Sequence, residues 1–262
     1  MFVPFFLLHL QILPFCVLFF TLLWAVSLPL KDASIVDRFW GLGFMFFYVV
    51  SVIYTHAEIT PKNIIGFVLI SLWALRLSIH IHTRNKGHAE DYRYQEMRKK
   101  YHPFALLSLP IVFWSQAVIL WIVALPLLSL IVDREHSNWS NVGILIWAVG
   151  LYFEARGDWE LKEFKKNPTH KGQLLTTGLW SLTRHPNYFG DTLMWWGIFI
   201  FCLPVGWYTA IGPIFMTFFI VKVSGVSLTD KSLSQSKPGF EGYIKSTPAF
   251  FPKITGYKSF ER

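Results

Sequence analysis

Long apolar runs, repeated along the chain, constrain its fold more than any other feature. A bilayer's hydrocarbon core of about 30 Å requires about 20 mostly apolar residues in a helix. Segments that meet this length, some of them barely, are 3–28, 39–57, 63–82, 105–132, 141–163, 187–203 and 206–228. We therefore predict an all-α fold, a polytopic membrane bundle of about seven transmembrane helices, in a single domain over 1–262 with a tail over 229–262.

The composition excludes several other classes of protein. Apolar residues make up 53% of the chain and charged residues only 15%, well below the roughly 25% of soluble proteins. The net charge of +8 comes from basic residues in short loops, which favours lipid headgroups or an anionic ligand over nucleic acid. Cys16 and Cys202 lie in apolar runs, so they indicate neither a disulfide framework nor a metal site.

The ends and prolines of the apolar runs add detail. Residues 3–30 have no basic segment before them and no small-residue cleavage site, which favours a retained helix over a signal peptide. Pro14, Pro110 and Pro126 predict kinks in the first and fourth helices.

Basic residues predict the orientation in the membrane. They concentrate in the 83–104 loop, in the 162–186 connection and in the region from 222 to 262, and they are scarce in the loops 58–62, 133–140 and 204–205. By the positive-inside rule, the N-terminus is outside and the C-terminus is cytosolic.

The densest polar cluster lies at 178–191, at the start of the sixth apolar segment. Pro186 suits the first turn of a helix, which places Asn187 and Asp191 on one face. Arg184 and His185 precede this helix, and its N-terminal N–H groups favour an anion. The alternative is an ordinary cap at the membrane interface.

A second cluster lies on the fifth predicted helix. Glu154, Asp158 and Lys165 follow one face, and Arg156 and Glu160 pair on another. Acids at the end of a membrane helix must face protein or water. They either pair with basic residues of another helix, such as Arg76 or Arg84, or accept hydrogen bonds from a ligand.

A basic stripe descends the third helix, and further polar residues lie in loops. Arg76, His80 and Arg84 share one face, and Arg76 lies too deep for simple snorkelling, which favours an anionic partner. The loop Glu90–Tyr94 mixes charges with aromatic rings. It either lies in solvent and binds lipid headgroups, or it closes over a ligand. Asp37 is predicted as the N-cap of the second helix. Gln116, midway along the fourth helix, is a substrate candidate or an interhelical hydrogen-bonding residue.

Together these residues resemble the membrane-embedded steroid 5-alpha-reductase superfamily (3-oxo-5-alpha-steroid 4-dehydrogenase C-terminal-like), and most closely its bacterial branch of membrane reductases. The resemblance covers nearly the whole chain, and Arg184-His-Pro-Asn-Tyr-Phe-Gly190 is its most specific part. Its other matches are Asp37…Trp40-Gly41, Arg76…Arg84, Glu90-Asp-x-Arg-Tyr94, Asp158…Phe164-Lys165, Gly178-Leu-Trp180, Trp195-Trp-Gly197 and Tyr243…Thr247…Pro252.

The resemblance implies seven membrane helices, a cytosolic cavity for NADPH, and reduction of a carbon–carbon double bond in a lipid substrate. Asn187 and Asp191 then hold the nicotinamide–ribose end, and Glu154 and Asp158 line the adenosine side. Arg76, Arg84, Lys165 and Lys171 meet phosphates. The full expected cofactor set is Asp37, Arg76, Arg84, Asp91, Arg93, Tyr94, Glu154, Asp158, Lys165, Lys171, Arg184, His185, Asn187, Tyr188, Asp191 and Tyr243. His80, Tyr48 and Tyr188 are the candidate catalytic donors to the enolate oxygen, with Gln116 and Trp195 at the substrate.

Departures from the family pattern leave alternatives open. Asp191 stands where relatives commonly carry Glu, Phe240 replaces a frequent Tyr, and the Gln-Glu pair that engages a 3-keto steroid is not found. Membrane methyltransferases of the isoprenylcysteine or phospholipid type also carry Arg-His-Pro-x-Tyr, and they bind S-adenosylmethionine. A third alternative is a lipid-binding scaffold without catalysis. In every case the expected partners are the bilayer and a lipophilic molecule, in a bacterial inner membrane or, in a eukaryote, the endoplasmic reticulum.

Overall fold

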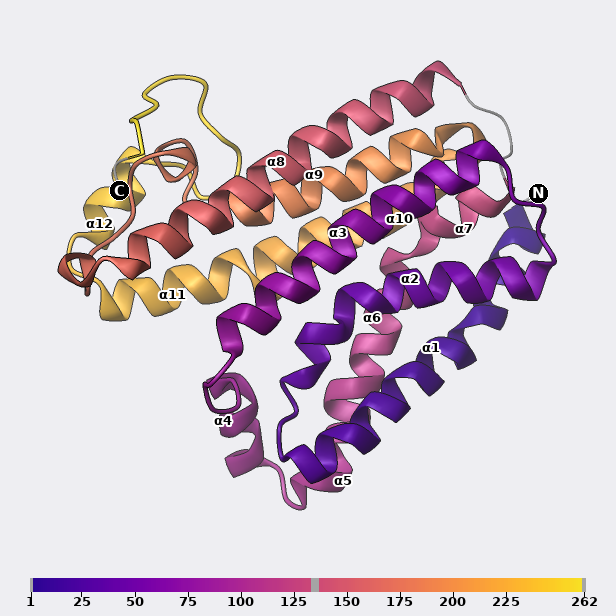
Figure 1. Ribbon diagram of the computed structural model, residues 1–262, viewed down its shortest axis with the longest axis horizontal. Coiled ribbons are helices and arrows are strands. Elements are labelled where there is room, and N and C mark those ends of the chain that lie inside the picture. Colours follow the sequence, from indigo (N-terminus) through magenta and orange to yellow (C-terminus); the bar gives the residue numbers. More distant parts are fainter. Residues whose placement is uncertain (1, 133–136, 261–262) are drawn as a thin grey trace. The chain divides into compact units, whose positions relative to one another are not determined.

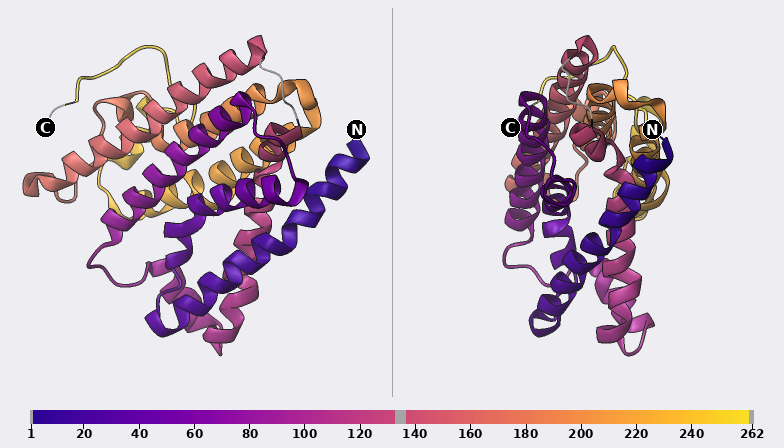
Figure 2. Two further views of the ribbon diagram at one scale, coloured as in Figure 1. Left: turned by 45° about the vertical axis from the view of Figure 1, so that its right-hand side comes forward. Right: turned by 90° about the vertical axis from the view of Figure 1, so that its right-hand side faces the viewer.

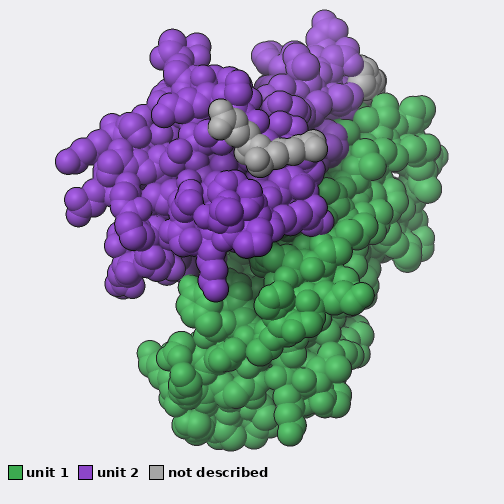
Figure 3. Space-filling model, turned by 60° about the vertical axis from the view of Figure 1, so that its left-hand side comes forward, with its two compact units in different colours: residues 1–136 green, residues 137–262 purple. Residues whose placement is uncertain are grey.

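The fold is described from a computed structural model, which covers residues 2–132 and 137–260. The regular elements in these ranges are all helices, and one isolated antiparallel bridge joins Gly178 to Lys258. The predicted all-α class is therefore confirmed. The chain divides into two compact units, residues 1–136 and residues 137–262 (Figure 3). The single domain over 1–262 stays a prediction.

Unit 1 begins with three long helices, α1 (Phe2–Leu30), α2 (Ile35–Thr55) and α3 (Pro61–Asn85), and continues with the short polar α4 (Tyr92–Lys100) (Figure 1). A capping box begins α3, because Thr60 accepts from the Asn63 backbone and the Asn63 side chain accepts from the Thr60 backbone. Pro61 at the first position suits this start, since its missing N–H would have no helical partner. Within the unit, α2 packs against both α1 and α3.

The fourth predicted helix, 105–132, is broken into pieces. The structure has α5 (Phe104–Ser108), the π-helical turn η1 (Leu109–Trp114), α6 (Ser115–Val123) and α7 (Leu125–Val132). Pro110 lies inside η1, and Pro126 is the second residue of α7. Because proline has no N–H and its ring crowds the preceding turn, these two residues account for the breaks.

Unit 2 opens with α8 (Asn138–Lys166) and continues with α9 (Pro186–Phe201) (Figure 1). As predicted, Pro186 is the first residue of its helix. The shorter elements are η2 (Pro168–His170), η3 (Leu179–Ser181), η4 (Leu203–Val205), η5 (Trp207–Ala210), α10 (Ile211–Phe218), the π-helical turn η6 (Phe219–Ser224), α11 (Val226–Ser236) and α12 (Phe240–Ser246). The predicted tail over 229–262 therefore begins inside α11, and the helix expected over 206–228 is divided between η5, α10, η6 and α11.

A seam of glycines holds α8 and α9 side by side (Figures 1 and 2). Gly143 and Gly150 of α8 face Gly197 and Gly190 of α9. A Cβ at Gly190 would lie 2.4 Å from the Glu154 nitrogen and 2.4 Å from the Gly150 oxygen. The two backbones approach this closely only because these positions have no side chain, as in tightly packed membrane helices.

The helices that are long and apolar enough to span a bilayer lie, among the described residues, at Pro4–Leu30, Ile35–Thr55, Pro61–Asn85, Phe104–Val123 and Trp207–Ser236. These five spans make the chain an integral membrane protein of helical type. The predicted segments 141–163 and 187–203 correspond to α8 and α9, which are not among them. α9 has only 16 residues, and the second half of α8 is rich in charge. The number of seven crossings and the outside N-terminus stay predictions.

Candidate functional site

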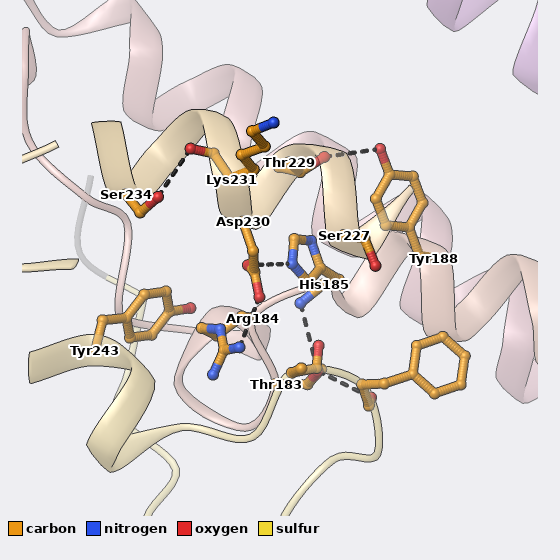
Figure 4. A network of polar contacts seen from close by, with 12 residues as sticks. Thr183, Arg184, His185, Tyr188, Ser227, Thr229, Asp230, Lys231, Ser234 and Tyr243 are labelled. Carbon is orange, nitrogen blue, oxygen red and sulfur yellow. Dashed lines mark hydrogen bonds and ion pairs between the residues drawn. The ribbon is translucent and has the colours of Figure 1, made fainter. Parts of the chain in front are cut away.

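The start of α9 carries a network of charged side chains (Figure 4). Asp230 of α11 accepts from Arg184 Nη2 at 2.7 Å and pairs with His185 Nε2 at 2.8 Å. Arg184 and His185 are buried, with 7% and 1% of their surfaces exposed. The negative partner that we expect at this helix start is thus a carboxylate of the chain itself.

Tyr188 extends this network along α9 (Figure 4). Its ring stacks on His185 with centroids 5.4 Å apart, and its hydroxyl lies 3.4 Å from Thr229 Oγ1 of α11. Sequence reasoning did not identify Asp230 or Thr229, because nothing local to residues 226–236 indicates a partner more than 40 residues earlier. The one signal that could have drawn attention to Asp230 is that it is the only acidic residue in the segment 226–236.

The acids of α8 meet the amide of α9. Asp158 Oδ1 accepts from Asn187 Nδ2 at 3.0 Å, and Asp158 is only 8% exposed. Gly157 permits this contact, because a Cβ there would lie 3.0 Å from the Pro186 ring. Glu154 is 3% exposed, and its backbone packs against Gly190. The structure thus brings together the predicted residues Glu154, Asp158 and Asn187, with Asp191 one turn further along α9.

The Gly178-Leu-Trp motif is held by a buried carboxylate. Glu160 Oε2 accepts from the Leu179 backbone at 2.8 Å, and Glu160 Oε1 accepts from Arg156 at 2.9 Å, which confirms the predicted pair. Gly178 adopts φ 62° and ψ −142°, and a Cβ there would lie 2.3 Å from Glu160 Oε2. Glycine is therefore required both by the backbone conformation and by the space. Trp180 Nε1 completes the turn by donating to the Gly157 oxygen at 3.0 Å.

The C-terminal segment returns along the 178–184 turn. Arg184 Nη1 donates to the Thr247 oxygen at 2.7 Å, its backbone N–H donates to Pro248, and the Lys253 N–H donates to Leu182. Tyr243 is buried, its hydroxyl donates to the Trp180 oxygen, and burial raises the pKa of this phenol. These contacts hold the C-terminal segment against the 178–184 turn.

A cavity of about 680 Å³ lies at the C-terminal end of α8 within unit 2. Its wall comes from the end of α8, the 167–175 segment, Trp180, α11 and Tyr243. The basic side chains that line it are Lys165, Lys166, His170, Lys171, Arg184 and Lys237. No acidic residue is among the described residues that line it. The predicted residues Lys165, Lys171, Arg184 and Tyr243 thus share one cavity, joined by Lys166, His170 and Lys237, which the sequence did not single out.

In unit 1, four of the predicted cofactor residues contact one another. Arg93 donates to Asp37 Oδ2 at 2.7 Å and to Asp91 Oδ1 at 2.9 Å, and the Tyr94 hydroxyl donates to Asp37 Oδ1 at 2.8 Å. Asp37 is the third residue of α2 and Ser34 is its N-cap residue, so the prediction of Asp37 as an N-cap is wrong. The carboxylate binds α4 instead of capping its own helix. This arrangement ties α4 to the start of α2, and a cofactor contact by these residues stays a prediction.

These contacts shift the pKa values of Asp91 and Tyr94. Burial opposes the charged form of Asp91, but the hydrogen bonds and positive charge of Arg93 outweigh it and lower the pKa of this carboxyl. Burial, together with the neighbouring charge of Asp37, raises the pKa of Tyr94 well above its ordinary value. Tyr94 therefore serves here as a neutral hydrogen-bond donor.

The remaining predicted residues of unit 1 lie on separate helices. Arg76, His80 and Arg84 all belong to the continuous α3, as their spacing predicts; the first two are half-buried and Arg84 is exposed. Gln116 is half-buried on α6. Tyr48 is buried, donates to the Asn63 oxygen at 3.0 Å, and lines an apolar cavity of about 280 Å³ between α2 and α3. In unit 2, Trp195 is buried on α9. That the residues of both units share one site stays a prediction.

The fold and this site define a helical membrane protein with a cation-lined cavity beside an arginine–histidine–aspartate network. The chain belongs to the family described as "Protein of unknown function (DUF1295)", whose profile matches residues 23–247.

The proteins similar to this chain include a sterol reductase and a probable O-methyltransferase. An uncharacterized protein of Schizosaccharomyces pombe is 25% identical over 271 positions, covering 89% of this chain and 76% of the relative. Delta(14)-sterol reductase erg24 of Schizosaccharomyces pombe is 36% identical over 92 residues, or 34% of this chain and 21% of that protein. Probable O-methyltransferase ustE of Ustilaginoidea virens is 51% identical over 51 residues, or 20% of this chain and 18% of that protein. No solved structure matches the chain.

Proposed function

We propose that this protein is an integral membrane reductase that uses NADPH to reduce a carbon–carbon double bond in a hydrophobic, steroid-like or other enone lipid. On this proposal it belongs to the bacterial branch of the steroid 5-alpha-reductase superfamily. The partial likeness to a sterol reductase supports the reaction class.

The charge of the cavity in unit 2 carries the proposal. Five Lys or Arg side chains line it and no acid does, among the residues that the structure describes there. Such a wall suits a ligand with several phosphates, because each phosphate gains charge-assisted hydrogen bonds. S-adenosylmethionine bears a sulfonium and an ammonium against one carboxylate, so this wall disfavours it. The volume of about 680 Å³ also lies in the range of ligand pockets, roughly 300–1,000 Å³.

Residues of the chain bind and orient the cofactor. The bound NADPH would supply the hydride. Lys165, Lys171 and Arg184 face its phosphates. Asn187 and Asp158 are joined by a hydrogen bond at 3.0 Å, and on this proposal the pair meets ribose or amide groups of the cofactor. Asp191 of α9 and the buried Glu154 of α8 are proposed to complete the cofactor contacts.

Of the three candidate donors Tyr48, His80 and Tyr188, only Tyr188 lies in unit 2, which also holds the basic cavity. Reduction of an enone leaves negative charge on the substrate's oxygen, which a hydroxyl donor stabilises. Tyr188 follows Asn187 directly, and the stacked ring of His185 and the nearby Thr229 hydroxyl orient its phenol. Tyr48 and His80, and the substrate contacts expected of Gln116 and Trp195, remain part of the proposal. The substrate enters from the bilayer, in a bacterial inner membrane or the endoplasmic reticulum.

A methyltransferase that uses S-adenosylmethionine is the second candidate. The partial likeness to a probable O-methyltransferase favours it. The Arg184-His-Pro-x-Tyr188 segment is compatible with both enzymes.

Mass spectrometry of products distinguishes the two reactions. Purified protein in lipid nanodiscs is incubated with a panel of enone lipids and NADPH, or with S-adenosylmethionine. We expect products that have gained two hydrogens, one of them deuterium when the nicotinamide carries deuterium. Tyr188→Phe is expected to lower turnover by about a hundredfold while NADPH still binds. Products that gain a methyl group instead contradict the proposal.

A further inference from the structure

We propose that residues 248–260 form a membrane-surface segment, which inserts Phe251, Ile254 and Tyr257 among the headgroups of the bilayer and binds anionic lipid through its lysines. This inference does not depend on the proposed function, because it concerns exposed side chains that do not line the basic cavity.

The 248–260 segment follows α12 as a coil and exposes large apolar side chains (Figure 1). Ile254 is 100% exposed, Phe251 is 74% exposed and Tyr257 is 55% exposed. Single exposed apolar residues are common on any protein, but exposed apolar side chains that gather in one place are a feature of protein or membrane interaction sites. The segment therefore has the surface of a binding element.

Backbone hydrogen bonds fasten this segment to the turn before α9. Its oxygens at Pro248 and Lys258 accept from the N–H groups of Arg184 and Gly178, at 2.9 Å and 2.7 Å. Between these two points, the Lys253 N–H donates back to the same turn at 3.0 Å. The exposed apolar side chains thus project from a backbone that is held on both sides of them.

The neighbouring helix α8 shows the depth at which the segment lies. In its first half, Val142, Leu145, Val149 and Tyr152 are exposed, at spacings that place them on one face. The second half, Glu154–Lys166, is rich in charge. For a helix in a bilayer, this pattern places the border between hydrocarbon and headgroups near the middle of α8, because charged side chains are costly in the hydrocarbon.

Aromatic rings join the segment to this border. The centroid of the Phe251 ring lies 6.4 Å from that of Phe189 on α9, and Phe189 lies 5.2 Å from Phe153 on α8. Phe260 lies 5.5 Å from Trp159 of α8. Tyr and Trp side chains concentrate at the level of the headgroups in membrane proteins. The segment therefore lies beside the helices at the depth where its exposed side chains meet headgroups.

The charge of the segment favours anionic lipid. Lys253 and Lys258 belong to it and Lys245 ends the preceding α12, whereas residues 248–260 contain no Asp or Glu. Lys245 and Lys258 are exposed, and Lys253 Nζ donates to the Ser246 oxygen at 2.8 Å. Lysines near a membrane surface attract anionic headgroups, and apolar side chains beside them insert at the boundary with the acyl chains. Both kinds of side chain are present here.

Spin labels at single introduced cysteines measure the depth of the segment. The native Cys16 and Cys202 are buried, so the label attaches to the introduced cysteine. Ile254→Cys carries the label in the segment, and Gln235→Cys, exposed on α11, is the control position. The protein is placed in nanodiscs of phosphatidylcholine, alone or with an equal part of phosphatidylglycerol. Power saturation then gives the accessibility of each label to oxygen, which partitions into the bilayer, and to a water-soluble nickel chelate.

We expect the label at position 254 to be accessible to oxygen and protected from the nickel chelate, and the label at position 235 to show the reverse. Phosphatidylglycerol should strengthen the insertion. In its presence, Lys245→Gln and Lys258→Gln should each lower the ratio of inserted to water-exposed label by up to about fivefold. Lys231→Gln, which removes a charge from the exposed surface of α11, should leave this ratio unchanged.

A label at position 254 that is as accessible to the nickel chelate as the control label would overturn the proposal. Insertion that depends neither on phosphatidylglycerol nor on the two lysines would overturn it as well, because contact with acyl chains alone needs no anionic lipid. Protection of the label from both reagents, together with spin–spin broadening, would show that a second copy of the chain covers the segment in place of lipid.

Discussion

Asp230 is the residue on which the start of α9 most depends. Its carboxylate bridges Arg184 and His185, both of which are almost fully buried. The arginine also binds the returning C-terminal segment through Thr247. One acid therefore connects α11 with the start of α9 and, through Arg184, with the segment at Thr247.

Replacing Asp230 by alanine should destabilise the protein by about 3 kcal/mol, because it leaves the buried Arg184 without its counter-charge. Thermal unfolding in detergent, followed by circular dichroism, measures the loss. Lys231→Ala, one residue away and exposed, is the control and should unfold like the wild type. Equal unfolding of the two variants would contradict the role of Asp230.

Gly178→Ala should destabilise the protein much more than Gly172→Ala. Both glycines have positive φ, but the new methyl group meets Glu160 at position 178 and open space at position 172. We expect about 1 kcal/mol from conformation alone at Gly172 and on the order of 3 kcal/mol or more at Gly178. Chemical denaturation of both variants tests this, and similar losses would show that the Glu160 contact has no energetic weight.

Sequence reasoning found some of these residues and missed others. It identified Pro186 as a helix start and the Arg156–Glu160 pair, because both depend on neighbours within one turn. It missed Asp230, because that contact joins residues 45 and 46 positions apart. It also assigned Asp37 as a cap, although its strongest partner, Arg93, is 56 positions away.

At the scale of elements, the α8–α9 pair positions the site. The glycine seam brings Gly157 against Pro186, and this register places Asp158 opposite Asn187. The seam was readable in principle: glycines recur at seven-residue intervals at 143, 150 and 157, and again at 190 and 197. Seven residues are close to two helical turns, so they line one face of each helix. The breaks at Pro110 and Pro126 were predicted as kinks, but the π-helical turns have no comparable sequence signal.

Gly190→Ala should force α8 and α9 apart and misalign Asp158 and Asn187. Its methyl group would meet backbone atoms of Glu154 and Gly150, which cannot move aside as a side chain can. We expect a loss of at least about 2 kcal/mol in stability and weaker NADPH binding. Gly242→Ala is the matched control, because it lies inside α12 with open space around its Cβ. That variant should be neutral or stabilised by up to about 1 kcal/mol. Full NADPH affinity in Gly190→Ala would contradict the positioning role of the seam.

At the scale of the whole molecule, charge and hydrocarbon are separated. Five described helices are long and apolar enough to span a bilayer, and α8 carries its charged residues towards one end. The basic cavity lies at the end of α8, so the net charge of +8 is partly concentrated around one cavity. Composition predicted the membrane class, and it predicted contact with either anionic lipid headgroups or an anionic ligand, which stays a prediction. It could not predict the cavity, whose wall combines five segments of unit 2.

The identity of the bound cofactor tests this account most directly. Thermal unfolding of the purified protein is measured in detergent with NADPH and, in parallel, with S-adenosylmethionine. A ligand present at a hundred times its dissociation constant stabilises the folded state by about 2.7 kcal/mol. We expect NADPH to raise the unfolding temperature and S-adenosylmethionine to leave it unchanged. Stabilisation by S-adenosylmethionine alone would contradict the reductase and make the Arg184–His185 region the site of a methyl donor.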